Sequence, residues 1–153
     1  MTDQEVTTGQ PADDEQLLQR FPGVAINQDN RAYYLGLLQQ QLLLNKCAAC
    51  KSWHYPPRPM CPDCWSDAVA PEQVSGDGRI HLVVGLPQHN ADAERIVVAV
   101  ELNEQPGLRF TADLLHEHAA DLNMIGARVE LAWHEVDGAP CPAFRLKNGS
   151  ERS

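Results

Sequence analysis

The sequence lacks both a long apolar run and the motifs that are typical of active sites. None of its apolar stretches approaches the length of a membrane-spanning helix, and the first residues, Met1 to Val6, are acidic where a signal peptide would be basic. A Walker loop, a nucleophile elbow, an H-E-x-x-H motif and paired catalytic carboxylates are all missing. We therefore expect a cytoplasmic protein without a membrane partner and without catalytic activity of its own.

Positive charge is also scarce. The chain has 12 Lys and Arg residues against 21 Asp and Glu, which gives a formal net charge of −9. A phosphate backbone repels such a chain, so the composition argues against a general nucleic-acid partner. With 153 residues, 43% of them hydrophobic, the chain is long enough for one ordinary domain, or for a small module beside a small barrel.

Four of the five cysteines form two C-x2-C pairs that are separated by ten residues: Cys47, Cys50, Cys61 and Cys64. Two residues between thiolates let one tight turn present both sulfurs to a metal, and two such turns close a tetrahedral site. Zinc is the expected metal, and iron in a rubredoxin-like site is the alternative. Four thiolates leave no open coordination position, which indicates a structural metal.

Disulfides and a redox role are less consistent with this pattern. Disulfides require an exporting context, and a redox C-x-x-C motif opens a helix, whereas both pairs here lie in loop-like sequence. The fifth cysteine, Cys141, is interpreted as a small buried hydrophobic residue.

The region before the cysteines predicts one helix. Residues 1–20 are interpreted as an acidic, largely disordered tail with at most one helical turn. Tyr33, Tyr34, Leu37 and Leu38 recur at helical spacing, so a helix is expected within residues 27–41, capped by Asn27 or Asp29. A short strand over residues 42–46 then leads into the metal site. Residues 21–71 are thus predicted to hold the helix and a zinc ribbon.

After Cys64 the pattern changes to β-strands. Strands are expected near residues 78–86, 95–102, 108–114, 127–136 and 143–146, with a helical or looped piece over residues 116–124. Five strands with this interruption predict an OB-fold barrel over residues 72–148, followed by a tail at 149–153. Gly76 and Gly78 precede a strand, so they predict a turn and not a phosphate loop. The motif His116-Glu117-His118 is interpreted as a solvated loop, because it is too short to define a metal site.

Taken in order, these features resemble the acyl-CoA-associated zinc-ribbon/OB-fold proteins, formerly a family of unknown function. Besides the helix and the four cysteines, the resemblance rests on five short stretches between residues 26 and 146: Pro56-Pro-Arg58, Ser75-Gly-x-Gly78, Ile96-Val-Val-Ala-Val-Glu-Leu102, Ile125-Gly126 and Pro142-Ala-Phe144. It implies a mainly β protein in which an N-terminal helix and a rubredoxin-like zinc ribbon precede a five-stranded OB-fold barrel.

The resemblance also implies a function. Members of this family are non-catalytic subunits that dock on a thiolase-superfamily enzyme, namely a thiolase, an acyltransferase or a lipid-transfer-protein-type aldolase, in lipid, steroid or acyl-CoA metabolism. They help to complete the acyl-CoA site, so a hetero-oligomer is expected here. The family usually places glycine at positive φ after each C-x2-C pair, where this chain has Lys51 and Trp65, and before the first ribbon strand, where it has Gln40-Gln41.

Candidate binding residues follow from that interpretation. Arg58, Arg31 and Lys51 are the candidate contacts for the CoA phosphates, in a site shared with the enzyme, because a chain of charge −9 should not hold CoA alone. The candidate docking residues are aromatic or apolar side chains of a module that is small for burying them all: Tyr33, Tyr34, Leu37, Trp53 and Tyr55.

Two other functions remain open at this point. An OB-fold nucleic-acid binder would need a cationic strand face, but the barrel offers only Phe110, Trp133 and Phe144 without an evident cationic cluster. A rubredoxin-like electron carrier would use the same four thiolates to hold iron.

Overall fold

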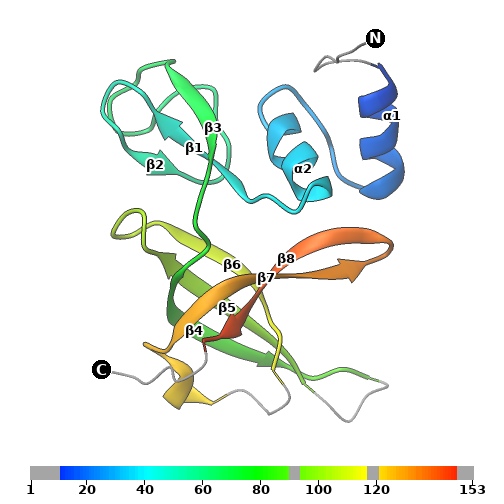
Figure 1. Ribbon diagram of the computed structural model, residues 1–153, viewed down its shortest axis with the longest axis vertical. Helices are drawn as coiled ribbons and strands as arrows, with labels where there is room; N and C mark the ends of the chain where they lie inside the picture. The colour runs from blue at the N-terminus through cyan, green and yellow to red at the C-terminus, as the bar shows by residue number, and fades with distance from the viewer. Residues whose placement is uncertain (1–10, 90–93, 117–120, 148–153) are drawn as a thin grey trace.

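The computed structural model describes residues 11–89, 94–116 and 121–147. A small sheet and two helices lie at one end of the long axis, and a barrel lies at the other (Figure 1). The tails expected at residues 1–10 and 149–153, and Glu117 and His118 of the histidine motif, fall outside the described residues. Within the described ranges, no helix combines the length and the apolar character that a membrane span requires.

Five strands close the barrel in the order β4-β5-β6-β8-β7. They are β4 (Gly78–Leu86), β5 (Arg95–Leu102), β6 (Arg109–Leu114), β7 (Arg128–Val136) and β8 (Ala139–Leu146). All neighbours are antiparallel except β6 and β8. A 3-10 helix, η1 (Leu122–Met124), lies between β6 and β7. The predicted five-stranded OB-fold barrel with an interruption after its third strand is confirmed.

The barrel closes around a core that the alternation of β5 illustrates. Ile96, Val98, Val100 and Leu102 are all buried, whereas the residues between them are only partly covered. Alternate side chains of a strand point to opposite faces, so one face of β5 supplies four core residues. Phe144 from β8 is completely buried in the same core.

The second sheet is the ribbon, with strand order β2-β1-β3. It contains β1 (Leu43–Cys47), β2 (Trp53–His54) and β3 (Val69–Gln73), and β3 pairs with β1 along its whole length. The sequence does not predict β3, and the boundary expected between residues 71 and 72 falls inside it. Four of the five residues of β3 are exposed, so this strand carries no apolar alternation that could reveal it.

The two helices differ from expectation. Residues 11–20 form helix α1 (Pro11–Arg20), so the prediction of a largely disordered tail up to residue 20 is wrong for this half. Its Leu17 is completely buried, and Arg20 Nε donates a hydrogen bond to the carbonyl of Gly138 at 3.1 Å. Burial of one leucine and this bond to the barrel supply the tertiary support that a short polar helix needs.

Helix α2 (Arg31–Leu38) is shorter than the expected span of residues 27–41. Asn30 occupies the N-cap position and makes no side-chain capping bond, so the predicted cap by Asn27 or Asp29 is wrong. The Asn27 carboxamide oxygen instead accepts hydrogen bonds from the backbone N–H groups of Asp29 and Asn30, which closes a turn before the helix.

A chain of aromatic rings joins the helices and the ribbon to the barrel. Successive ring centroids lie between 5.0 and 6.4 Å apart, within the usual range for aromatic pairs, in the order Phe21, Tyr34, Tyr33, Tyr55, Phe110, Phe144. Gln105, in the turn between β5 and β6, adds a polar joint. Its side-chain oxygen accepts a hydrogen bond from the Trp53 N–H at 2.8 Å, and its side-chain nitrogen donates to the Trp53 carbonyl at 3.0 Å.

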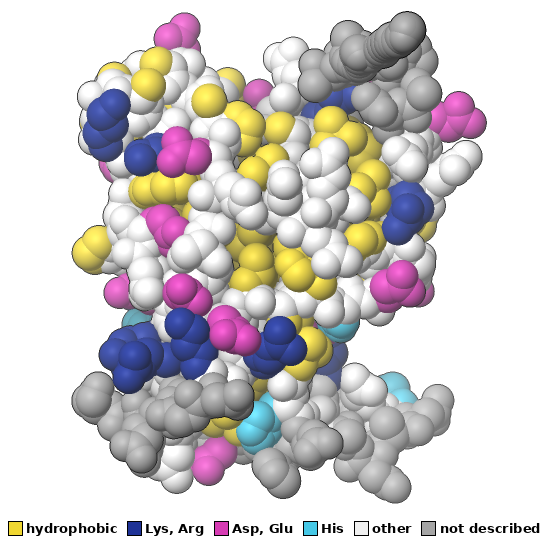
Figure 2. All heavy atoms as spheres, viewed as in Figure 1, with side chains coloured by type: hydrophobic (Ala, Val, Ile, Leu, Met, Phe, Trp, Pro, Cys, Tyr) yellow, Lys and Arg dark blue, Asp and Glu magenta, His cyan; other side chains and the backbone are white. Residues whose placement is uncertain are grey.

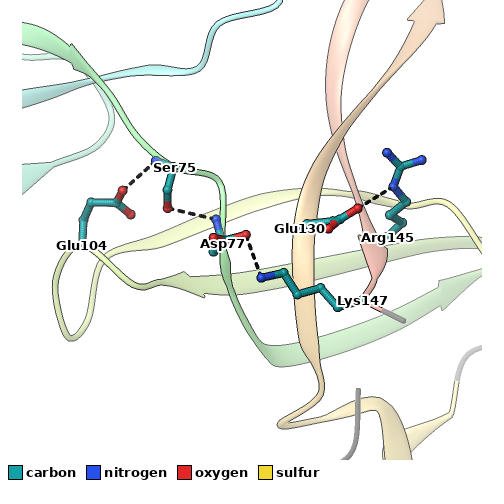
Figure 3. Close-up of polar contacts among 6 residues, drawn as sticks. All are labelled: Ser75, Asp77, Glu104, Glu130, Arg145 and Lys147. Carbon is teal, nitrogen blue, oxygen red and sulfur yellow. Dashed lines mark hydrogen bonds and ion pairs between the residues drawn. The ribbon is translucent and has the colours of Figure 1, made fainter. Parts of the chain in front are cut away.

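The link from β3 to β4 joins the ribbon to the barrel and is held by polar contacts (Figure 3). The N–H of Ser75 donates to Glu104 at 2.7 Å, and the N–H of Asp77 donates to the Ser75 hydroxyl at 3.2 Å. The Asp77 carboxylate forms an ion pair with Lys147 at 3.2 Å. Gly76 lies at φ +85°, and a Cβ there would approach Leu131 Cβ to 2.4 Å. The glycine therefore serves close packing, in agreement with the absence of a phosphate-loop motif.

We predict that Gly76→Ala lowers the free energy of unfolding by about 2–5 kcal/mol, because the new methyl group combines a left-handed backbone with a steric clash. Gly107→Ala is the matched control. Gly107 has φ +83°, and a methyl group added there would meet no atom within 4 Å, so only the backbone cost, about 1–2 kcal/mol, should appear. Urea unfolding of both variants measures the difference, and equal losses would contradict the role assigned to Leu131.

Candidate metal centre and surrounding surfaces

The four cysteines of the two C-x2-C pairs meet at one point of the ribbon. All four sulfur atoms lie within 4.8 Å of one another, and Cys47–Cys64 and Cys50–Cys61 are each 3.6 Å apart. A tetrahedral zinc with Zn–S bonds of about 2.3 Å requires sulfurs about 3.8 Å apart. The donor set and its spacing therefore fit a tetrathiolate zinc ion.

The two cysteine loops share one backbone pattern. In the first loop the N–H of Lys51 donates to the Cys47 carbonyl at 2.9 Å, and in the second the N–H of Trp65 donates to the Cys61 carbonyl at 2.9 Å. Lys51 has φ 68° and Trp65 has φ 65°, so both adopt the left-handed conformation that glycine usually provides in this family. Gln40 before the first ribbon strand does the same, with φ 56°.

The electrostatics of the cluster call for a cation. The backbone N–H of Cys50 is the main cause that lowers the pKa of the Cys47 thiol to about 7. The N–H of Ser52 also favours the thiolate of Cys50, but burial and the neighbouring sulfurs outweigh it and raise the pKa of Cys50. Four adjacent thiols cannot all ionise without a compensating positive charge, which a divalent metal supplies.

The described part of the chain offers no second metal centre. Within residues 11–89, 94–116 and 121–147, the four cysteines are the single group of three or more His, Cys, Asp or Glu residues that is close enough to hold a metal ion. Cys141 lies on β8 outside the cluster and is half-buried. Burial, with Asp113 and Asp137 nearby, raises the pKa of its thiol, so Cys141 stays protonated at neutral pH.

The three predicted CoA contacts do not form a common site. Arg31 forms an ion pair with Asp14 at 2.6 Å and is largely covered. Arg58 lines a cleft of about 370 Å³ between α2 and the ribbon, which neither Arg31 nor Lys51 reaches and to which Asp29 and Asp67 contribute acidic groups. Lys51 is exposed beside the first cysteine loop.

Burial contradicts three of the five predicted docking residues. Tyr33, Leu37 and Trp53 are buried in the protein's own core, and Trp53 is only 8% exposed. All three belong to one buried hydrophobic cluster that also contains the core residues of the barrel. Tyr34 is half-buried, and Tyr55 remains 39% exposed.

A different aromatic residue is the most exposed large apolar side chain of the ribbon. Trp65 is 72% exposed, and Met60, at the other side of the second cysteine loop, is 44% exposed. The hydrogen bond from the Cys61 N–H to the Ser66 carbonyl, 2.8 Å long, brings the two ends of this loop together. The one feature of the sequence that could have drawn attention to Trp65 is that it replaces the glycine that the family usually has at this position.

Comparison with known proteins gives consistent matches. Residues 36–70 match the family model described as the ChsH2 rubredoxin-like zinc ribbon domain. A probable enoyl-CoA hydratase alpha subunit from Thermomonospora curvata is 36% identical over 136 residues, which are 86% of this chain but 42% of that relative. This chain therefore spans less than half of the length of that protein.

A second relative and two solved structures match this chain over most of their own length. A DUF35 domain-containing scaffold protein from Methanothermobacter thermautotrophicus is 32% identical over 113 residues, which are 67% of this chain and 83% of that protein. A chain of the Ltp2-ChsH2(DUF35) aldolase superposes with a TM-score of 0.69 at 31% identity, over 80% of this chain and 98% of that chain. A DUF35 protein of Sulfolobus solfataricus shares the fold, with a TM-score of 0.58 at 11% identity over 88% and 95% of the two chains.

We predict one zinc ion per chain and expect Cys61→Ser to lose it. Structural zinc contributes on the order of 10–16 kcal/mol in small zinc-binding peptides, so the ribbon should unfold while the barrel, which has its own core, keeps its amide chemical shifts. Metal analysis and amide NMR spectra test this, with Cys141→Ser as the control that retains zinc. Visible colour and bound iron in freshly purified protein would instead support the electron-carrier alternative.

Proposed function

This chain belongs to the DUF35 zinc-ribbon family, and on that basis we propose that it is a non-catalytic accessory subunit of a thiolase-superfamily enzyme. The observation that carries the proposal is the match, at 31% identity, to nearly the whole length of a chain of the Ltp2-ChsH2(DUF35) aldolase. The archaeal relative, described as a scaffold protein, supports the same role. The ribbon stabilises the module, and the enzyme supplies the chemistry.

The arrangement of titratable groups supports a non-catalytic role. Cys141 lies opposite His134 in the pairing of β7 with β8, and His134 Nε2 is 3.8 Å from the Asp113 carboxylate, so the residue types of a cysteine triad occur together. The Asp113 carboxylate, however, is held by Arg95 at 2.9 Å, and the raised pKa of Cys141 disfavours a thiolate nucleophile. The hydratase description belongs to a relative of which the matched residues make up 42%.

The proposed acyl-CoA site is shared with the enzyme. Arg58 and Lys51 are the ribbon cations that remain available to approach a CoA phosphate, whereas Arg31 is engaged by Asp14 and secures α1 to α2. A nucleic-acid role is less consistent with the net charge of −9.

We place the docking contact at Trp65 and Met60 on the ribbon. A bulky residue at positive φ is strained by roughly 1–2 kcal/mol, and the residue at this strained position is a tryptophan whose side chain is exposed to solvent. The positive φ serves the second cysteine loop, as it does at Lys51 in the first, but exposure of a tryptophan does not benefit the isolated chain. Tryptophan is enriched among the few residues that dominate protein–protein affinity, which makes Trp65 a suitable anchor for the enzyme.

Affinity purification from the native host should recover a thiolase-superfamily enzyme in a stable complex, and the chain alone should show no acyl-CoA turnover. Mass spectrometry identifies the enzyme. Light scattering then tests direct binding, because it measures the mass of the complex that forms when the two purified proteins are mixed. Thioesterase, hydratase or thiolase activity of the isolated chain, or recovery of nucleic acid in place of an enzyme, would contradict the proposal.

Two tryptophan variants should separate docking from stability. We expect Trp65→Ala to weaken binding of the co-purified enzyme at least about tenfold, equivalent to roughly 1.4 kcal/mol, without lowering the thermal midpoint. Trp53→Ala, at a buried position, should instead lower the free energy of unfolding by about 3–5 kcal/mol. Calorimetric titration and thermal unfolding measure both effects. If Trp65→Ala binds as tightly as the wild type, the docking surface lies elsewhere.

A further inference from the structure

One edge of strand β4 is open over the second half of its length. β4 forms ladder pairs with β7 only at Gly78 and Arg79, and the main chain of Ile80 is then bonded to the loop before β7. From Leu82 to Leu86 the strand pairs with β5 on its other side, and no other strand in the described parts of the chain forms a ladder with it. Five residues of β4 therefore present an unpaired edge.

The free main-chain groups on this edge belong to Val83 and Gly85. The N–H and the carbonyl of Ile80 bond to residues 126–127 at 3.0 and 2.8 Å, so the main-chain groups of Ile80 point away from β5. Such groups alternate between the two edges of an antiparallel strand, and the bulge after Ile80 adds one residue to β4. The N–H and carbonyl groups of Val83 and Gly85 therefore point to the open edge.

Three aliphatic side chains lie along the same stretch, on the outer face of the barrel. Leu82, Val84 and Leu86 alternate with the inward-facing positions of β4, and they are 53%, 43% and 41% exposed. Val97 and Ala99, opposite Val84 and Leu82 on β5, are half-buried on this face. The open edge is therefore apolar as well as unpaired.

The two edges of the ribbon sheet are blocked, in contrast to the open edge of β4. The Gln105 carboxamide occupies the main-chain groups of Trp53 on β2. Strand β3, at the other edge, carries Pro71 and Glu72, and a proline or a charge is a usual means of preventing a further strand from pairing. The stretch from Leu82 to Leu86 has neither, so it is a template for a strand of another chain.

We infer that this edge pairs with the same edge of a second copy of the chain, in an antiparallel dimer with its two-fold axis at Val84. In that register Val83 lies opposite Gly85 of the second copy, so the free N–H and carbonyl groups of both edges are satisfied. On the outer face Val84 meets its own counterpart, and Leu82 meets Leu86 of the second copy. All cross-strand pairs on that face are then aliphatic, so the edge is complementary to itself.

The distribution of charge favours this arrangement of two copies. Each copy carries a net charge of −9, so two copies repel one another in most orientations. Charged side chains lie over the barrel on the face that Figure 2 shows, but none occurs between Leu82 and Leu86. The Glu94 carboxylate lies beside Gly85, on the face opposite to that of the three aliphatic side chains. It therefore does not interrupt their contact with the second copy.

The size of the contact predicts a weak and reversible dimer. Five paired residues extend over about 17 Å, and such a pairing covers much less than the ~800 Å² per partner of a standard interface. Salt should strengthen the dimer, because it screens the repulsion between two acidic chains. The inference does not depend on the proposed accessory role, since it is tested with the chain alone.

Sedimentation velocity of the full chain, from micromolar to millimolar concentration, tests the dimer. We expect the average mass to rise toward twice that of the monomer, and to rise further at high salt. Hydrogen exchange locates the contact. The amides of Val83 and Gly85 should exchange at least about tenfold more slowly at the highest concentration than at the lowest.

Val84→Lys should weaken the dimer at least about tenfold, because it places two like charges opposite one another at the two-fold axis. The same change makes each copy less acidic, so general repulsion between copies would have the opposite effect. Thr111→Lys is the matched control, because Thr111 is an exposed residue of the same outer face on β6, away from the edge. Val84→Thr keeps the β-branched shape, and it should also weaken the dimer if the lysine variant lowers the thermal midpoint.

A chain that stays monomeric throughout this range would overturn the inference, and so would a dimer that both Val84 variants leave unchanged. Slower exchange of other amides, without a change at Val83 and Gly85, would place the contact elsewhere and overturn it too. If the chain stays monomeric and Val84→Lys loses the co-purified enzyme, the edge pairs with a strand of that enzyme and not with a second copy.

Discussion

Mutual repulsion among four sulfur atoms is the constraint on which the ribbon, and the residues that it presents to the barrel, depend. The two cysteine loops hold their sulfurs within 4.8 Å of one another, and the backbone N–H groups that stabilise one thiolate cannot stabilise four. A bound cation attracts all four thiolates and so removes this repulsion. The free energy of binding a structural zinc ion is about as large as the 5–15 kcal/mol by which a typical domain is stable. The arm between the loops carries Trp53 and Tyr55, so the closed loops position the residues that reach the barrel.

The parts of the fold that the sequence predicts are those with a local signal. The doubled C-x2-C spacing locates the metal site, and the alternation in stretches such as residues 95–102 locates the barrel strands. β3 and α1 lack such signals, because β3 is an exposed strand and α1 is a polar helix that depends on Leu17 and on a bond from Arg20 to a loop more than a hundred residues away. Tertiary contacts determine whether β3 and α1 form, and such contacts cannot be inferred from the composition of the two segments.

The same dependence on tertiary contacts explains why the sequence does not identify the exposed binding surfaces. An aromatic side chain can be buried by its own chain or by a partner, and the sequence does not distinguish the two. Tyr33 and Trp53 belong to the first kind, since both are buried in a cluster that includes barrel residues, whereas the Trp65 side chain is exposed to solvent. The stretch from Leu82 to Leu86 has the pattern of an ordinary barrel strand, and its open edge follows from the short pairing of β4 with β7.

The joint at Gln105 has a consequence for how the two parts of the molecule can vary. Its carboxamide bonds to the main-chain N–H and carbonyl of Trp53 and to no side-chain atom of that residue. The hydrogen bonds of Gln105 to the ribbon therefore depend on the backbone conformation at residue 53 and not on which side chain stands there. These two hydrogen bonds can form with any residue at position 53 that has a free N–H, whereas a change at residue 105 removes both of them and leaves the aromatic contacts to hold the two parts together.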